Sequence, residues 1–209
     1  MSGKGARDAD LRDQIIDTAT HLFAELGYDQ TPLTMIADTT GIGLPVLQAE
    51  VGAKKDLYVA VMERAYLQER QMLNAAIAEF TPDRAGVHRF LDRYLDFYLK
   101  YPHISALWLQ RRLQDAADIT GIERAFSAPQ LRMVAGTVAP ALAPHLDPEF
   151  VLWTIVWTID NFVQGGIPDA EGHRLGLTDP ATTRRFRTHM HHLTDYLISH
   201  APPPAPGPR

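Results

Sequence analysis

The chain has 209 residues, 45% of them hydrophobic, and a formal net charge of −5 at pH 7, which is typical of a globular protein with ample material for a core. It contains no cysteine, so disulfides, thiolate metal sites and cysteine nucleophiles are excluded, as suits a reducing compartment. The polar N-terminus shows no signal peptide, and the longest apolar run, residues 150–159, is too short to span a bilayer; we therefore expect a cytoplasmic protein without membrane association.

The first predicted helix covers residues 10–26, where apolar side chains recur at helical spacing. Residues 1–7 before it are predicted to be disordered. Gly27 ends the helix, whose apolar face is expected to clamp the segment that follows.

Residues 31–57 show the pattern of two short helices joined by a tight turn. Thr31 is the predicted N-cap and Pro32 the first helical residue, and Gly41 suits a left-handed turn. Pro45 then marks the first turn of a second helix with a small apolar face. A helix, a turn containing glycine and a second helix form a helix-turn-helix, whose second helix enters a DNA major groove.

The segment from residue 15 to residue 57 resembles the DNA-binding domain of the tetracycline-repressor (TetR) family. The matching positions are Ile16, Ala19, Leu22, Phe23, Gly27, Tyr28, Ile36, Ala37, Gly41, Ile42, Pro45, Leu47, Lys54 and Leu57. The resemblance implies a ligand-responsive regulator, a repressor, that binds double-stranded DNA at a palindromic operator. We expect Gly43, Leu44, Val46, Gln48 and Ala49 to face the groove, and Thr31, Thr34 and Lys54 to contact phosphates.

The second helix departs from the family pattern at three positions. Gln48 stands where the family usually has Tyr, and Glu50 and Val51 stand where it has His-Phe. Residues 1–58 carry five cationic and nine anionic side chains, so we expect weak non-specific DNA binding with a shallow salt dependence. The alternative is a TetR-like ligand-sensing and dimerisation module whose degenerate head does not bind DNA specifically.

The rest of the chain predicts an all-α protein. Helices are expected over residues 53–80, 83–101, 102–116, 127–139, 149–164 and 179–200, where apolar periodicity is bounded by proline and glycine. We divide the chain into an N-terminal arm and helix-turn-helix domain (1–52), a helical ligand-binding and dimerisation domain (53–200) and a disordered Pro-rich tail (201–209). The helix at 149–164 is apolar on nearly all sides, which predicts burial by more than one partner. The last two helices are expected to form a homodimer through a four-helix bundle.

Aromatic residues of the second domain predict a pocket for a small hydrophobic or aromatic effector. The candidate ligand-binding residues are Tyr94, Phe97, Trp108, Arg111, Trp153, Trp157, Asp160 and Gln164. Trp153, Trp157 and Asp160 share a helix face by spacing, and Arg111 or Arg112 would neutralise an anionic group. The alternative is that the aromatics only form core and dimer interface.

An enzyme is not expected. The chain has no Gly-rich phosphate loop, no H-E-x-x-H and no nucleophile elbow. His189 and His192 are spaced as metal ligands on the last helix, but without a carboxylate at matched spacing we expect solvated or interface histidines, no metal and no cofactor.

Overall fold

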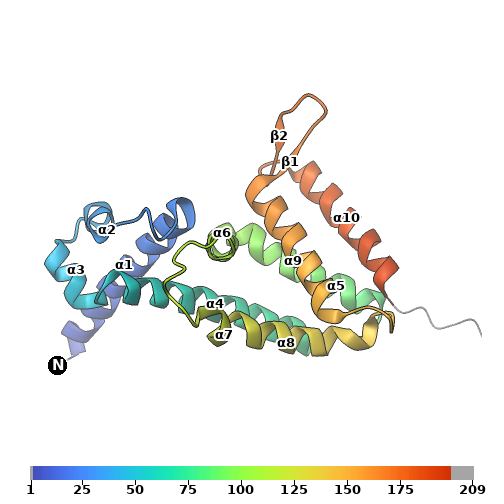
Figure 1. The fold of residues 1–209 in the computed structure, drawn as a ribbon, viewed down its shortest axis with the longest axis horizontal. Coiled ribbons are helices and arrows are strands. Elements are labelled where there is room, and N and C mark those ends of the chain that lie inside the picture. The colour runs from blue at the N-terminus through green and yellow to red at the C-terminus, as the bar shows by residue number, and fades with distance from the viewer. Residues whose placement is uncertain (1, 199–209) are drawn as a thin grey trace, which may run out of the picture.

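The structure, a computed structural model, describes the backbone of residues 2–198 and the side chains of residues 9–198 (Figure 1). The predicted Pro-rich tail lies outside the described residues. The helices are α1 (Ser2–Leu26), α2 (Leu33–Thr40), α3 (Leu44–Val51), α4 (Lys54–Ala78), α5 (Arg84–Lys100), α6 (Pro102–Arg112), α7 (Ile122–Ala125), α8 (Ser127–Val138), η1 (Ala139–Ala141), α9 (Pro148–Gly165) and α10 (Pro180–Leu197). The prediction of an all-α fold is confirmed.

Helix α1 begins earlier than predicted. The helix extends back to Ser2, whereas residues 1–7 were expected to be disordered. Adding residues to an existing helix requires no new nucleation, so a polar segment can continue the helix without an apolar face of its own.

The two β-strands of the described chain form a hairpin that the sequence did not predict. Strands β1 (Ile167–Pro168) and β2 (Arg174–Leu175) pair antiparallel, with Ile167 opposite Leu175. The hairpin connects α9 to α10 at the top of Figure 1. The sequence predicted only a polar loop here, because two-residue strands carry no periodicity.

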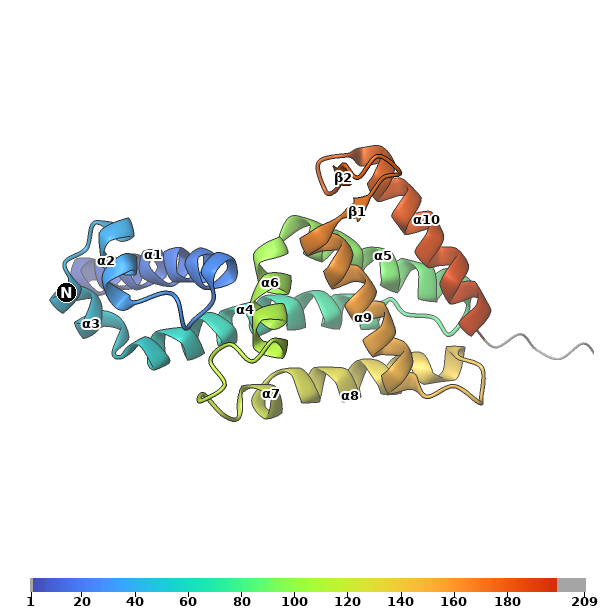
Figure 2. The ribbon, with the colours of Figure 1, turned by 45° about the horizontal axis from the view of Figure 1, so that its top comes forward.

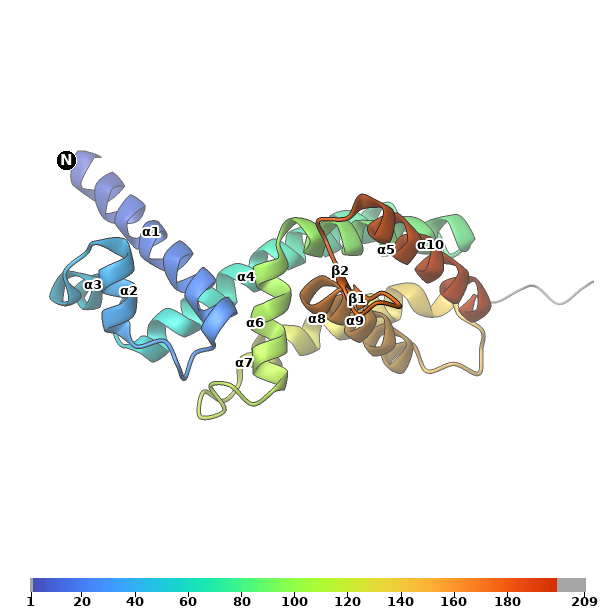
Figure 3. The same ribbon diagram turned by 90° about the horizontal axis from the view of Figure 1, so that it is seen from above.

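Helix α4 joins two parts of the molecule, the head (α1–α3) and the body (α5–α10), as Figure 2 shows. Its N-terminal part contributes Leu57 and Tyr58 to the core beneath α1, and its C-terminal part packs on α5 and α8. Helix α1 also packs on α6, which crosses α4 in Figure 3. One hydrophobic core therefore runs from Ile15 in the head to Met190 in the last helix.

The apolar helix α9 is covered on one side only in the single chain. Leu152, Ile159 and Phe162 are buried, but Phe150 is 68% and Trp157 46% exposed. The prediction that more than one partner buries this helix is confirmed, since α5, α6 and α8 all pack against it. An outer face of the helix nevertheless stays open in the single chain.

Candidate nucleic-acid interface and ligand cavity

The connection from α1 to α2 is built around a buried threonine. Thr31 is fully buried, and its hydroxyl donates to the Gly27 carbonyl at 2.7 Å. Helix α2 begins at Leu33 with Pro32 as its N-cap and no side-chain capping bond. Thr31 therefore holds the turn after α1 together, and its predicted roles as cap of α2 and as a phosphate contact are both wrong.

The turn of the helix-turn-helix has the geometry that its glycine predicts. Gly41 lies in the left-handed region at φ 71°, and the Ile42 N–H donates to the Ala37 carbonyl at 3.1 Å. This closes the end of α2 as in a Schellman-type cap. Leu47 and Val51 of α3 are buried against α1 and α4, so the orientation of α3 follows from its two apolar anchors.

The outward face of α3 carries the residues predicted to meet DNA. Gly43, Val46, Gln48 and Ala49 are exposed and Leu44 is half-buried. The face is therefore free to enter a groove, and it presents apolar and amide groups instead of cations.

Two of the predicted phosphate contacts have different surroundings. Thr34 is exposed in the first turn of α2. Lys54 is half-buried and places its ammonium 4.1 Å from the centre of the Tyr28 ring, a cation–π contact that joins the start of α4 to the end of α1. The missed residue here is Arg12, whose guanidinium donates to the Glu50 carbonyl and braces α3 against α1.

A single carboxylate of the body holds the head at the turn after α1. Asp115, in the loop of residues 113–121 (the 113–121 loop), accepts the backbone N–H of Tyr28 at 2.7 Å and that of Asp29 at 3.0 Å. Gly27 precedes them at φ 84°, and a Cβ there would lie 3.1 Å from the Asp115 carboxylate. No sequence signal marks this contact, because its partners are more than eighty residues apart along the chain.

Arg111 organises the 113–121 loop. Its guanidinium pairs with Glu123 at 2.6 Å and donates to the carbonyls of Ala116 at 2.5 Å and Ile119 at 3.2 Å. The loop needs this support, since Gln114 and Ala116 have positive φ values of 72° and 54°, which are strained for residues other than glycine. The guanidinium is thus already paired within the chain, and the role of Arg111 towards a bound anion stays a prediction.

The body encloses a cavity of about 380 Å³, within the range for small-molecule sites. Helices α4, α5, α6, α8 and α9 supply most of its wall. Of the predicted ligand-binding residues, the wall contains Tyr94, Trp108, Arg111, Trp153 and Asp160.

The other three predicted ligand-binding residues lie outside this cavity. Phe97 packs its ring on Tyr98 and Tyr101, and the Gln164 amide donates to the Pro102 carbonyl at 2.7 Å. Trp157 stacks on Trp153 on the open face of α9. Trp157 therefore does not share the cavity with Trp153 and Asp160. At 3.6 residues per turn, Asp160 at i+7 returns to within about 20° of Trp153, whereas Trp157 at i+4 is offset by about 40° to the other side.

One buried carboxylate of the cavity is paired with an arginine. Asp160 of α9 accepts from the Ser105 hydroxyl at 2.7 Å and forms an ion pair with Arg112. Burial raises the pKa of Asp160, while the bonds from Ser105 and Arg112 oppose that rise. Arg112, rather than Arg111, is the arginine that interacts with Asp160, and its charge is also balanced.

The second buried carboxylate, Glu69 of α4, was missed in the sequence. It accepts from the Tyr98 hydroxyl at 2.5 Å and from the Gln130 amide at 2.9 Å, and burial is the main cause that raises its pKa. A signal was present, because Glu69 continues the i, i+4 series of buried residues from Val61 through Ala65.

The histidines of α10 are separate from the cavity. His189 and His192 are exposed, while His191 bonds to Asp92 at 2.8 Å and stacks on His88 at 4.1 Å. His200 lies outside the described residues. Among residues 2–198, no helix combines the length and the apolarity needed to cross a bilayer.

Comparison with known sequences gives a partial match. No protein-family model matches the chain. The chain is 28% identical over 86 residues to the HTH-type transcriptional activator FasR of Mycolicibacterium smegmatis (strain ATCC 700084 / mc(2)155), a match that covers 41% of this chain and 39% of that relative. The chain therefore spans less than half the length of this curated relative.

Solved structures are similar over most of their length. They include a TetR-like transcriptional regulator from Rhodococcus sp. RHA1 (TM-score 0.61, 20% identity, 87% of this chain and 94% of that one). AibR in complex with isovaleryl coenzyme A and operator DNA has a TM-score of 0.70 at 15% identity, over 87% and 96%. A putative transcriptional regulator from Saccharomonospora viridis in complex with choline has a TM-score of 0.66 at 17% identity, over 92% and 100%. The chain thus has the TetR-like fold, and the resemblance seen in residues 15–57 is confirmed at the level of fold.

Proposed function

We propose that the chain is a DNA-binding transcriptional regulator that acts as a homodimer on a palindromic operator and is released by a small hydrophobic or aromatic effector. The observation that carries the proposal is the arrangement of α3, in which Leu47 and Val51 are anchored in the core while Val46, Gln48 and Ala49 face outward. The FasR similarity and the TetR-like fold support a regulator that acts in the cytoplasm.

The open face of α9 supports the dimer. Phe150 and Trp157 are exposed on α9 and Tyr196 is 85% exposed on α10, which is costly for a monomer and suits a contact between copies of the last two helices. Binding to a palindrome requires the two α3 helices of such a dimer to lie about one DNA turn apart, roughly 34–36 Å. Trp157→Glu should give a monomer in sedimentation analysis, whereas the exposed-residue control Glu63→Gln should leave the dimer intact.

The cavity and its link to the head support an effector. Arg111 lines the cavity and holds the 113–121 loop, and Asp115 of that loop holds the turn after α1. A ligand that displaces Arg111 would therefore move the head relative to the body and lower the affinity for DNA. The neighbour AibR, solved with isovaleryl coenzyme A and operator DNA, shows that a protein of this fold can hold both kinds of partner.

The test is selection of DNA from a random pool, followed by titration of the enriched sequence at two salt concentrations. We expect a palindrome, a shallow salt dependence and weaker binding by Gln48→Ala, because Gln48 is an exposed α3 side chain that can read adenine. The proposed sign is repression; FasR is named an activator, so a reporter gene behind the selected site decides the sign.

A second candidate function is a ligand sensor whose head does not bind DNA specifically. The observation in its favour is that no lysine or arginine occurs from Thr34 to Gly52, and that Glu50 stands on α3. Absence of any enriched sequence at low salt, for the ligand-free dimer, would establish this alternative and reject the regulator.

A further inference from the structure

The body cavity carries five charged side chains, and four of them are paired with one another. Arg111 pairs with Glu123 at 2.6 Å, and Arg112 pairs with Asp160. Glu69 is the remaining one, and its partners in the described chain are neutral: the Tyr98 hydroxyl, the Gln130 amide and the Trp108 indole. The cavity thus contains one buried acid without a cation.

Burying an unpaired carboxylate costs free energy unless a cation or a proton compensates its charge. A buried carboxylate is stabilised as an anion by a cation, and in its absence it takes up a proton instead. Leucine would fill this position of the buried series on α4 without a charge, as Leu73 does one turn later. A ligand that brings a positive charge would account for the presence of Glu69 in the wall.

The neighbouring polar atoms favour a cation with N–H groups. The side-chain oxygen of Gln130 is buried and has no hydrogen-bond partner among the described residues, although its amide nitrogen bonds Glu69. Two acceptors, the Glu69 carboxylate and the Gln130 oxygen, are thus present on adjacent side chains of the wall. An ammonium group donates several hydrogen bonds and accepts none, so it matches both.

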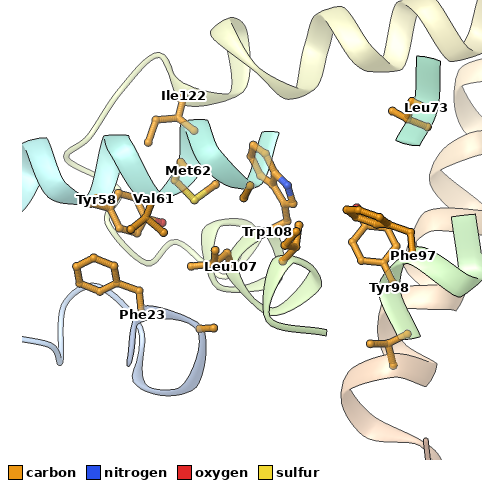
Figure 4. Close-up of a cluster of buried hydrophobic side chains, with 14 of the residues drawn as sticks. Phe23, Tyr58, Val61, Met62, Leu73, Phe97, Tyr98, Leu107, Trp108 and Ile122 are labelled. Atoms are coloured by element: carbon orange, nitrogen blue, oxygen red, sulfur yellow. The ribbon is translucent and has the colours of Figure 1, made fainter. Parts of the chain in front are cut away.

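Aromatic and aliphatic side chains surround this polar corner. Tyr94 and Tyr98 lie edge to face with ring centres 4.9 Å apart, and Trp108 lines the same cavity. In Figure 4 the indole of Trp108 lies to one side of the Tyr98 ring, and Leu73 lies above Tyr98. Aromatic faces attract cations within about 6 Å, and the rest of the wall is apolar enough to cover a hydrocarbon body.

We propose that the effector cavity binds hydrophobic amines, with the ammonium group held by Glu69 and the Gln130 oxygen and the apolar body enclosed by the aromatic wall. This inference rests on the proposed function, since it names the chemical class of the effector. It excludes hydrophobic carboxylates as the preferred ligands, because both arginines of the wall are already paired.

The test compares three probes with one body and different head groups: 4-phenylbutylamine, 4-phenyl-1-butanol and 4-phenylbutyrate. Calorimetric titration of the DNA-free protein should show the amine binding roughly ten- to a hundredfold more tightly than the alcohol, the range expected for a buried charged hydrogen bond, and the carboxylate most weakly. If the amine does not exceed the alcohol, whether both bind or neither does, the proposal is overturned.

Two variants on one helix separate the roles of charge and packing. Glu69→Gln keeps the shape of the side chain, and it should abolish the preference for the amine over the alcohol. Glu63→Gln makes the same change on the exposed side of α4 and should keep the preference. An unchanged preference in Glu69→Gln would overturn the proposal.

Wild-type protein provides a measurement that does not depend on a variant folding. The affinity for the amine should rise with pH as Glu69 ionises above the ordinary glutamate range, while the affinity for the alcohol should not rise. The groups that face Glu69 are Tyr94 and Tyr98 from α5 and Asp160 from α9. Burial raises the pKa of both tyrosines, so they stay neutral over this range. Equal pH profiles for the two probes would contradict the proposal.

Titration of the selected DNA in the presence of the amine keeps the two proposals apart. Release of the DNA by the amine, but not by the alcohol, supports both. If the amine binds and no DNA is ever bound, the proposed ligand class stands and the proposed DNA-binding function is rejected. If DNA is bound but the amine is not, the DNA-binding function stands and the ligand class is rejected.

Discussion

Replacement of Asp115 by alanine should loosen the head from the body. The Asp115 carboxylate accepts two backbone N–H groups of the turn after α1, at 2.7 and 3.0 Å. A hydrogen bond to a charged group contributes about 1.5–3 kcal/mol, and the Asp29 N–H is exposed and can bind water instead. We therefore expect Asp115→Ala to lower the free energy of unfolding by about 2 kcal/mol. Asp115→Asn keeps one acceptor and should cost about half of that.

Differential scanning calorimetry checks this expectation. For a chain of this size 1 kcal/mol corresponds to roughly 2–4 °C, so Asp115→Ala should lower Tm by about 4–8 °C. Asp118→Ala is the matched control, since Asp118 is exposed in the same loop, and it should stay within about 0.5 kcal/mol of wild type. Equal Tm values for the two alanine variants would show that the hydrogen bonds of Asp115 do not stabilise the protein. In the DNA titration, Asp115→Ala should also respond less to effector, because the link from the cavity to the head passes through this residue.

Three further predictions follow from single residues. Gly27→Ala forces a Cβ to within 3.1 Å of Asp115 at φ 84° and should destabilise by about 1–2 kcal/mol in denaturant unfolding; a neutral effect would show that the turn can relax. Leu47→Ala removes a fully buried side chain from α3 and should lower the free energy of unfolding by about 3 kcal/mol. Gln48→Ala should lower the affinity for DNA and leave the free energy of unfolding unchanged. Similar losses of stability in both variants would mean that the assignment of the α3 faces is wrong. Burial raises the folded-state pKa of Glu69 from its ordinary value of 4.5, so the contribution of Glu69 to stability is present below that value and is lost as pH rises through the folded-state pKa. Unfolding curves measured across this pH interval should show wild type losing stability relative to Glu69→Gln. Parallel curves for the two proteins would contradict the burial of Glu69.

Local sequence signals specify the helical architecture and the helix-turn-helix. Gly41 marks the left-handed turn, and Asp83, Asp147 and Asp179 cap α5, α9 and α10 through side-chain bonds to the first-turn N–H groups. These signals are local: each involves residues within four positions of one another, so they act before any tertiary contact forms. The faces of α3 were also readable, since Leu47 and Val51 lie one turn apart.

The cavity and the contact between Asp115 and the head, by contrast, depend on how the helices pack. Tyr94, Trp108 and Asp160 come together because α5, α6 and α9 pack around α4, and Trp157 is excluded although its helix spacing from Trp153 is favourable. The Asp115 contact joins segments that no sequence pattern relates. Helical periodicity states which side chains share a face, but it does not state what that face meets, because a short-range pattern carries no information on how helices cross. The chemical character of the cavity, a buried acid among paired charges, therefore emerges only when the helices are assembled.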